Sequence, residues 1–469
     1  MARINNNSSR SIAVNVLDRF NPAKHNASSL LKGMISQTDR RAHTTDLVFG
    51  TIRNMPLIDK LIEQIAQRSP KRIHKKLLNI IRIGVYEFVF CPETAEYAIV
   101  NEAVDIASQI GGKKQSGFVN AVLRNVERAI DNRQVALDEN NSTKIIPQNQ
   151  THGCKFKQDV LPALDNETAL YYSTAFSLPL WLVESWHQSY GTDKLRQICF
   201  ASNRSPSVCA QANTLKISLD ELYKKFCADG VECRLFSEDN SIRISSKQAV
   251  NHLAGFDDGL FMIQDPTAAK VARLLDPKPG DTIADMCAAP GGKTMSLAMR
   301  IKDTGSIIAT DIDAKRLEMV QLNSNRLGVN SVTVVSAEQF DSVNAQKGTF
   351  DCILLDVPCS NSGVMARRPE VRLRIQPDTI AEIKKIQYQL LEKAVELIKP
   401  GGRICYSTCS ICPQENEQLV QAFLAANKGF SLAAEHLTLP ACGQYDAAGK
   451  LDTLDHDGGY VAVLSKTHS

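Results

Sequence analysis

Residues 285–294, Asp-Met-Cys-Ala-Ala-Pro-Gly-Gly-Lys-Thr, join a predicted strand to a predicted helix. The apolar, β-branched run 282–284 before them is typical of a buried strand, and residues 294–300 after them have the pattern of a helix. A strand, a glycine-rich turn and a helix open the βαβ unit of nucleotide-binding folds, because the glycines let a ligand approach the backbone. A glycine-rich turn is equally common as a plain tight turn, so the rest of the chain must decide.

Strands and helices alternate from about residue 259 onward, which predicts a mainly parallel sheet covered by helices on both faces. Ligands of such sheets bind beyond the carboxyl ends of the strands. The last apolar run, 460–464, predicts a late strand that is open to an antiparallel direction. The other expected strands are 282–285, 306–310, 331–335, 350–355 and 403–407, and the expected helices are 266–275, 294–301, 314–327 and 378–398.

The chain before about residue 130 has helical periodicity and predicts a bundle of five or more helices, at about 12–20, 44–66, 75–90, 99–110 and 118–126. Basic residues cluster there, and two interpretations stay open: a solvated face or a patch that contacts phosphates. These residues are Lys71, Arg72, Lys75, Lys76, Arg82, Lys113, Lys114, Arg124 and Arg128.

Three domains and a linker are expected: a helical domain at 1–131, a linker at 132–165, a small helical and α/β unit at 166–256, and a catalytic α/β domain at 257–469. The linker prediction rests on a polar, Asn- and Gln-rich composition with weak periodicity. In the small unit, Ser218 and Glu221 have the spacing of a helix capping box.

Composition narrows the class of protein. The chain has 469 residues and a net charge of only +3, so any nucleic-acid surface must be a local patch. It has no run of about 18 apolar residues and no signal peptide, which predicts a cytoplasmic protein without a membrane span. Thirteen cysteines, several of them inside apolar runs, favour reduced thiols.

Polar residues follow several of the predicted strands. Asp311 lies about twenty residues after the turn, where an acidic side chain can bind a ribose diol, whereas Asp313 is better suited to cap the next helix. Cys359 and Cys409 each follow a buried strand, at the ligand side of the sheet. A lone buried cysteine is usually a small apolar residue, but two at neighbouring strand ends indicate thiolate chemistry, with Lys293 as a cation that could hold the charge.

The spacing of Cys409 and Cys412 also fits a metal or redox pair. A zinc site would need a second pair of ligands, and the sequence supplies none nearby, so we expect no metal.

These motifs together resemble the RNA cytosine-5 methyltransferases of the Nop/Sun family. The matching segments are 285–294, 356–360, 407–410 and 413–417, with support from 264–266 and 367–370. The N-terminal region resembles the NusB-type RNA-binding domain of the bacterial RsmB branch, through segments 38–41, 47–50, 82–87 and 118–124. The implied fold is multidomain: an all-α NusB-like bundle, a small α/β middle unit and a C-terminal Rossmann-like methyltransferase.

The resemblance implies S-adenosyl-L-methionine as cofactor and C5 of a cytosine in small-subunit (16S) rRNA as the target. It implies that Cys409 is the nucleophile at C6, that Cys359 releases the product, and that Asp356 contacts the base near N3. It also implies cofactor contacts from Cys287, Ala288, Ala289, Pro290, Gly291, Gly292, Lys293, Asp311 and Asp356, with Glu338 as a weaker candidate.

The chain departs from the family pattern at Asn361, Val371, Gln211 and Ala337, which affects the expected substrate contacts more than the reaction. Two alternatives stay open: a tRNA substrate, and a non-catalytic RNA-binding or assembly factor with a vestigial fold. The presence of both Cys409 and Cys359 beside the cofactor turn favours the enzyme. We expect small-subunit rRNA as partner, no membrane partner and a monomer.

Overall fold

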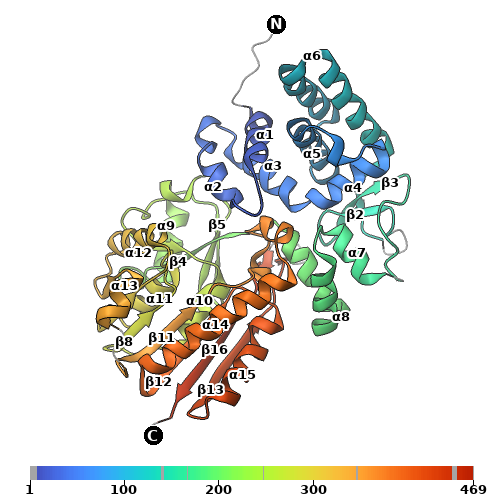
Figure 1. The fold of residues 1–469 in the computed structure, drawn as a ribbon. Coiled ribbons are helices and arrows are strands. Elements are labelled where there is room, and N and C mark those ends of the chain that lie inside the picture. The colour runs from blue at the N-terminus through green and yellow to red at the C-terminus, as the bar shows by residue number, and fades with distance from the viewer. Residues whose placement is uncertain are drawn as a thin grey trace. The chain divides into compact units, whose positions relative to one another are not determined.

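The computed structural model describes residues 8–138, 142–165, 167–246, 248–344, 347–445 and 451–467. The chain forms two compact units, whose elements are labelled in Figure 1. The first unit holds residues 1–204 together with a returning segment, 365–375, and the second holds residues 205–364 and 376–469. The segment 365–375 was expected inside the catalytic domain, and its return to the first unit could not be foreseen from local sequence.

The first unit begins with a helical bundle, as predicted. The expected helix at 44–66 is two helices, because Asn54 ends the first one and its side-chain amide donates to the carbonyl of Gly50 at 3.0 Å. The helix α6 is interrupted by non-helical backbone at Gly111 and Gly112. The helices are α1 (Ser9–Arg19), α2 (Ala27–Lys32), α3 (Arg41–Arg53), α4 (Met55–Ala66), α5 (Lys75–Phe90) and α6 (Glu96–Ala129).

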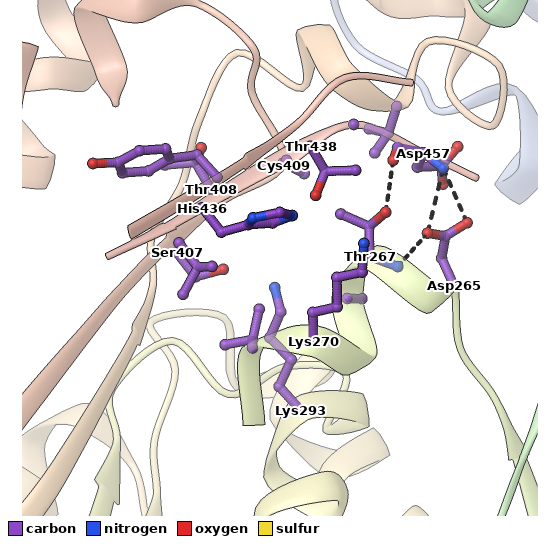
Figure 2. A pocket seen from close by; sticks show the side chains of 17 residues that line it. Asp265, Thr267, Lys270, Lys293, Ser407, Thr408, Cys409, His436, Thr438 and Asp457 are labelled. Atoms are coloured by element: carbon purple, nitrogen blue, oxygen red, sulfur yellow. Dashed lines mark hydrogen bonds between the residues drawn. The ribbon is translucent and has the colours of Figure 1, made fainter. Parts of the chain in front are cut away.

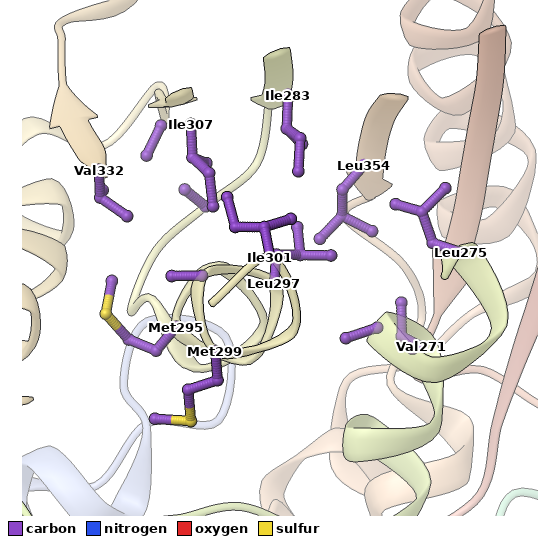
Figure 3. Close-up of a cluster of buried hydrophobic side chains, with 14 of the residues drawn as sticks. Val271, Leu275, Ile283, Met295, Leu297, Met299, Ile301, Ile307, Val332 and Leu354 are labelled. Carbon is purple, nitrogen blue, oxygen red and sulfur yellow. The ribbon is translucent and has the colours of Figure 1, made fainter. Parts of the chain in front are cut away.

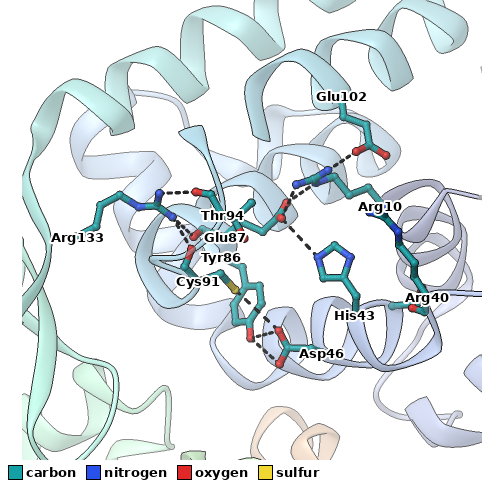
Figure 4. Close-up of polar contacts among 11 residues, drawn as sticks. Arg10, Arg40, His43, Asp46, Tyr86, Glu87, Cys91, Thr94, Glu102 and Arg133 are labelled. Carbon is teal, nitrogen blue, oxygen red and sulfur yellow. Dashed lines mark hydrogen bonds and ion pairs between the residues drawn. The ribbon is translucent and has the colours of Figure 1, made fainter. Parts of the chain in front are cut away.

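A buried ion pair lies inside this bundle (Figure 4). The guanidinium of Arg10 donates from Nε and Nη2 to the carboxyl group of Glu87, at 2.6 Å each, and from Nη1 to Glu102. Burial alone would lower the pKa of Arg10, but the two carboxylates outweigh it and raise that pKa. The charged groups are therefore tolerated in the core because they satisfy each other.

The prediction of a linker at 132–165 is wrong. Within the described residues, three antiparallel strands form a sheet in the order β1-β3-β2, from β1 (Ile130–Ala136), β2 (Ile145–Pro147) and β3 (His152–Phe156). Ile146, Cys154 and Phe156 are buried in it. β2 is apolar throughout but only three residues long, and Lys155 separates the buried Cys154 and Phe156 in β3, so the sequence contains no apolar run long enough to reveal the strands.

Arg133 fixes this sheet to the bundle. Its guanidinium donates to four backbone carbonyls at and beyond the carboxyl end of α5: Glu87, Phe88, Cys91 and Thr94, at 2.6–3.0 Å (Figure 4). A helix leaves its last carbonyls without intrahelical partners, so an arginine supplies the missing donors.

The first unit ends with α7 (Thr168–Ala175) and α8 (Leu180–Asn203), and the returning segment packs with them. Arg372 in that segment donates to the carbonyls of Arg53, Phe176 and Ser202, at 2.7–3.0 Å. These carbonyls lie at the carboxyl ends of α3, α7 and α8, respectively. One buried guanidinium therefore meets the partial negative charge of three helix ends.

The second unit contains two sheets. Within the described residues, the smaller one has four antiparallel strands in the order β5-β6-β4-β7. Helix α9 (Leu219–Ala228) covers it and begins with the predicted capping box of Ser218 and Glu221. The strands are β4 (Val208–Ala212), β5 (Cys233–Phe236), β6 (Ser241–Ile244) and β7 (Phe261–Ile263).

The larger sheet has the order β10-β9-β8-β11-β12-β16-β13 within the described residues. The first five strands are parallel, and β16 pairs antiparallel with both β12 and β13, so the predicted late strand is confirmed. The strands are β8 (Thr282–Asp285), β9 (Ser306–Ala309), β10 (Val332–Val334), β11 (Phe350–Asp356), β12 (Ile398–Thr408), β13 (Phe430–Thr438) and β16 (Gly459–Lys466). Two short strands, β14 (Gln444–Tyr445) and β15 (Leu451–Thr453), form a separate pair.

Helices cover both faces of this sheet, and each face has its own buried cluster. On one face, Leu297 and Ile301 pack towards Ile283, Ile307 and Leu354 of the strands (Figure 3). The helices are α10 (Pro266–Leu275), α11 (Gly292–Arg300) and α12 (Ala314–Leu327) on that face, α14 (Pro377–Leu397) and α15 (Glu417–Ala426) on the other, and the short α13 (Ala337–Gln339). In the part of the chain that the structure describes, no helix has the length and apolar character needed to cross a bilayer.

Candidate active site

The strand order reverses direction at β8. The chain runs from β8 outward to β9 and β10, and then returns to β11 on the other side of β8. Such a switch point leaves a crevice beyond the carboxyl ends of the two central strands, where α/β proteins bind ligands. Asp285 ends β8, Asp356 ends β11, and Ser407 of β12 is the register partner of Asp356.

The glycine-rich turn sits at this crevice. Gly291 has φ 103°, and a Cβ atom there would lie 3.2 Å from Cα of Val320 in α12, so only glycine allows this approach. The carboxyl group of Asp311 accepts hydrogen bonds from the backbone N–H groups of Ala289, at 3.1 Å, and Asp313, at 2.9 Å. Asp313 caps α12, as predicted, whereas Asp311 stabilises the turn through its hydrogen bond with the N–H of Ala289.

A buried carboxyl group lies beneath the turn. Oδ2 of Asp285 accepts from the hydroxyl of Thr294 at 2.7 Å, while Oδ1 has no hydrogen-bond partner among the described residues. Burial raises the pKa of Asp285 to about 7, and the nearby charge of Asp356 adds to the effect. A buried acceptor without a donor is rare in proteins and marks a place where a ligand donor fits.

Lys293 connects the turn to the end of β11. Its ammonium group forms an ion pair with Oδ1 of Asp356, which also accepts from the hydroxyl of Ser407 at 3.3 Å. Burial disfavours the charged lysine, but Asp356 and then the thiols of Cys409 and Cys359 outweigh burial and raise the pKa of Lys293. The site therefore keeps a fixed positive charge close to both sulfur atoms.

The two predicted cysteines meet. The Sγ atoms of Cys359 and Cys409 lie 3.1 Å apart, and the thiol of Cys409 also donates to Oδ1 of Asn361 at 3.2 Å. The hydrogen bond with Cys409, followed by burial, raises the pKa of Cys359 well above its usual value. Because β11 and β12 are neighbouring parallel strands, the loops that follow them bring the two free thiols side by side.

Glu415 ties these two loops together. Its buried carboxyl group accepts from the backbone N–H of Ser360 at 2.8 Å and from the hydroxyl of Ser410 at 2.6 Å. It also accepts from the side chain of Gln387 at 3.2 Å. Asn416 stabilises the loop after β12, because its side chain donates to the carbonyl of Ser410 at 3.0 Å and accepts from the hydroxyl of Thr408 at 2.7 Å. The sequence showed residues 413–417 only as a motif, and no local signal revealed this bridging role.

A cavity of about 60 Å³ opens beside Cys409 (Figure 2). Helix α10 and strands β12, β13 and β16 line it, and the ammonium of Lys293 points into it from α11. His436 and Lys270 lie at its wall, and burial, followed by the charge of Lys270, lowers the pKa of His436. The cavity places polar groups around the more accessible of the two thiols.

Comparison with known proteins identifies the family. The family model described as "16S rRNA methyltransferase RsmB/F" matches residues 272–464, the NusB family model matches 7–128, and an RsmF/B-like ferredoxin-like domain matches 178–251. A probable ribosomal RNA small subunit methyltransferase B from Synechocystis is 31% identical over 447 residues, which cover 93% of this chain and 94% of that protein. The chain belongs to the RsmB family of small-subunit rRNA methyltransferases.

Two further matches extend over almost the full length. A probable ribosomal RNA small subunit methyltransferase B from Bacillus subtilis is 28% identical, covering 97% of this chain and 98% of that protein. The crystal structure of PH0851 superimposes with a TM-score of 0.72 at 25% identity, covering 99% of this chain and 100% of that one. The resemblance to this family, the NusB-like bundle and the Rossmann-like methyltransferase domain are thereby confirmed.

The cofactor of this RsmB-family chain is S-adenosyl-L-methionine, and the site fits it. Gly291 leaves the turn without a side chain, and the buried carboxyl group of Asp285 lies beneath it. Asp311 holds its carboxyl group at the turn, within reach of a ribose. Residues 287–293 and Asp311 would hold the cofactor.

The remaining predicted site residues differ in position. Cys287 is half-buried in the turn. Burial raises the pKa of its thiol, and the carboxylates of Asp285, Asp356 and Asp311 raise it further. Cys287 is therefore not suited to act as a reactive thiolate. Glu338 is exposed in α13, and its side chain has no hydrogen bond or ion pair among the described residues. Across the described ranges, no group of three His, Cys, Asp or Glu side chains is arranged to hold a metal ion.

The basic residues of the first unit fall into two groups. Arg82 is paired with Asp59 at 2.7 Å and Arg124 with Glu127 at 2.8 Å, so these two charges are already neutralised. The other seven form no ion pair among the described residues: Lys76 is half-buried, and Lys71, Arg72, Lys75, Lys113, Lys114 and Arg128 are exposed. These seven remain the candidates for phosphate contacts.

Proposed function

We propose that this chain methylates C5 of a specific cytosine in 16S rRNA through a covalent bond between Cys409 and C6 of the base. The observation that carries the proposal is the pair of sulfur atoms, 3.1 Å apart, next to the ion pair of Lys293 and Asp356. Membership of the RsmB family supports small-subunit rRNA as the substrate.

The first step is attack by the Cys409 thiolate at C6. The S–C6 bond forms, and the electron pair of the C5–C6 double bond moves into the ring, so C5 becomes nucleophilic and negative charge develops towards N3. We assign Asp356 to hydrogen-bond the base near N3, and the ammonium of Lys293, which is paired with Asp356, offsets the negative charge. Lys293 also stabilises the thiolate, because its ammonium is held close to both sulfur atoms.

S-adenosyl-L-methionine, when bound at the turn, supplies the methyl group that C5 accepts. The residues of the chain orient the reactants: the turn and Asp311 hold one ligand, and Cys409 fixes the base at the other side of the crevice. Because C6 lies in the plane of a stacked base, the cytosine must be unpaired or turned out of its helix to reach this site.

The last step is release. A water molecule takes the proton from C5, the electron pair of the C–H bond restores the C5–C6 double bond, and the S–C6 bond breaks to return the Cys409 thiolate. Cys359 is the group next to the leaving sulfur, and its raised pKa keeps it protonated beside a thiolate. We assign Cys359 to this step.

Bisulfite sequencing of 16S rRNA and tRNA from cells with and without the gene tests the proposal. We expect one cytosine of 16S rRNA to lose its protection from deamination when the gene is absent, and to regain it with the wild-type chain but not with Cys409→Ala. Loss of a tRNA site instead would favour the tRNA alternative. Unchanged protection everywhere would favour the non-catalytic RNA-binding factor.

A further inference from the structure

The second unit contains another cavity, of about 570 Å³. It is lined by β4, β7, α10 and α11, and it shares no lining residue with the cavity beside Cys409. A volume in this range is typical of sites for small molecules or for one or two nucleotides. Nothing in the proposed reaction uses it.

A buried amide faces this cavity without a complete set of partners. The side chain of Gln264 is more than nine-tenths buried, and its Oε1 accepts from the hydroxyl of Ser296 at 3.0 Å. Its Nε2 donates no hydrogen bond to any residue of the described ranges. This amide nitrogen is not fully buried, so it is available to donate to an acceptor on a ligand in the cavity.

A second amide is held in a fixed orientation nearby. Gln211 is 4% exposed, and its Nε2 donates to the hydroxyl of Ser241 at 2.6 Å. Its Oε1 has only a long contact, 3.5 Å from Nδ2 of Asn240, and so retains acceptor capacity. Amides of this kind read the edge of a nucleobase, and the side chains of Met262 and Met299 give the cavity an apolar wall for the base itself.

The charges at this cavity favour an anionic ligand. Arg273, Arg300 and Lys302 line it, and no carboxylate of the described residues does. Arg300 is paired with Asp276 at 2.8 Å, whereas Arg273 and Lys302 have no ion pair within the described ranges. Arg273 lies in the last turn of α10, and Lys302 directly follows the C-cap residue of α11, so both cations also complement a helix dipole.

We propose that this cavity binds an unpaired segment of the RNA substrate, one or two nucleotides long and separate from the target cytosine. Arg273 and Lys302 contact the phosphates, Met262 and Met299 contact the base face, and Nε2 of Gln264 donates to the base edge. The identity of the ligand as RNA rests on the proposed function. A single-stranded segment is favoured over a duplex because its bases are free to enter a cavity.

The binding test uses a double charge reversal, Arg273→Glu with Lys302→Glu, in the full chain. A matched control carries Lys347→Glu with Lys428→Glu, which changes the net charge equally at two exposed positions away from the cavity. The probe is a fluorescent single-stranded RNA of about ten nucleotides, followed by anisotropy at several salt concentrations. We expect the first variant to bind at least about tenfold more weakly, with a salt slope smaller by about 1.4, since two phosphate contacts are lost. Equal losses in both variants, or none, would overturn the proposal.

Kinetics and crosslinking separate this proposal from the proposed function. With 16S rRNA as substrate, the double reversal should raise KM for RNA about tenfold, while the affinity for S-adenosyl-L-methionine and kcat stay as in the wild type. If the wild type transfers no methyl group but the RNA affinity responds as expected, the cavity assignment stands and the function fails. If methyl transfer proceeds with an unchanged KM in the double variant, the cavity assignment fails alone. A 4-thiouridine-substituted RNA should crosslink to peptides that contain Met262 or Met299, and crosslinks confined to other segments would contradict the assignment.

Discussion

Cys359 and Cys409 differ in their surroundings although their sulfur atoms lie 3.1 Å apart. Cys359 is buried, and its pKa is raised by the contact with Cys409 and by burial. Cys409 reaches the cavity and is closer to the route by which a base would enter. Two thiolates so close together would repel each other, so we expect only one of the two cysteines to be ionised at a time. The thiolate of Cys409 is the one that a ligand in the cavity can reach.

We predict opposite outcomes for the two cysteines. Cys409→Ala should lower methyl transfer by more than about a thousandfold, because no other thiol of the described residues lines the cavity. Cys359→Ala should accumulate a protein–RNA adduct that survives denaturing electrophoresis, since the S–C6 bond forms but is not released. The exposed Cys227→Ala serves as control and should behave as the wild type. An adduct in Cys409→Ala would contradict the assignment of Cys409 as the nucleophile. The absence of an adduct in Cys359→Ala would contradict the assignment of Cys359 to product release.

Asp285 makes stability depend on pH. Its pKa is raised to about 7 in the folded chain from an ordinary value of 3.8, because burial disfavours the carboxylate. The folded state therefore keeps this proton where the unfolded state has lost it. The stability linked to Asp285 is fully present below about pH 4 and is lost as the pH rises from 4 through 7.

The variant Asp285→Asn should flatten this dependence, because an amide has no proton to lose in this range. We expect the difference in unfolding free energy between the variant and the wild type to grow in favour of the variant from about pH 4 to about pH 7, measured by urea denaturation at each pH. A constant difference across that range would show that Asp285 does not retain its proton in the folded state.

At the scale of elements, the site depends on two loops that follow β11 and β12. The sheet brings their starts together, and hydroxyl groups join the loops directly beyond the strand ends, where Ser410 contacts Ser360 and Ser362. The carboxyl group of Glu415 adds a further connection, because it accepts from both Ser360 and Ser410. Glu415 comes from a short turn, residues 413–415, that also receives the hydroxyl of Tyr406 at the carbonyl of Glu415, at 2.6 Å. Glu415 therefore helps to hold the two loops at a fixed distance, although it forms no hydrogen bond with either sulfur atom among the described residues.

We predict that Glu415→Ala lowers kcat by about 10- to 100-fold, because loops that lose their common acceptor no longer hold Cys359 and Cys409 in register. The affinity for S-adenosyl-L-methionine should change by less than about twofold, since the turn at 287–293 makes no contact with Glu415. Glu415→Gln keeps an acceptor for the N–H of Ser360 and should recover part of the activity. If both variants lose activity only in proportion to their loss of folded protein, Glu415 is merely structural.

For the molecule as a whole, the sequence was most informative where local patterns decide structure. The βα alternation, the turn at Gly291 and the strand-end thiols all follow from short-range periodicity, and the structure brings Cys359 and Cys409 together as expected. The three-stranded sheet of β1–β3 was missed because its apolar runs are too short to indicate strands. The roles of Glu415 and Arg372 depend on partners far away in sequence, which no local pattern contains.

The segment 365–375 shows how one chain builds two units. It leaves the second unit just after the loop of Cys359 and is counted with the first, where Arg372 binds the carboxyl ends of three helices. Burial, followed by the charge of Arg53, lowers the pKa of Arg372 to about 9, so the guanidinium is still charged at neutral pH. No carboxylate among the described residues forms an ion pair with Arg372. The backbone carbonyls at the three helix ends accept its hydrogen bonds instead and offset its positive charge.

Arg372→Met keeps the bulk of the side chain but removes its donors, leaving buried carbonyls of α3, α7 and α8 without partners. We expect the unfolding free energy of the first unit to fall by about 2–4 kcal/mol. In the full chain, trypsin should cut sooner after Arg367 or Arg374, because the segment is then less firmly held, and mass spectrometry of the first fragments measures this. The exposed Arg19→Met, in the same unit, should be cut as slowly as the wild type. Early cleavage at the same sites in both variants, or in neither, would mean that the three helix ends do not depend on Arg372.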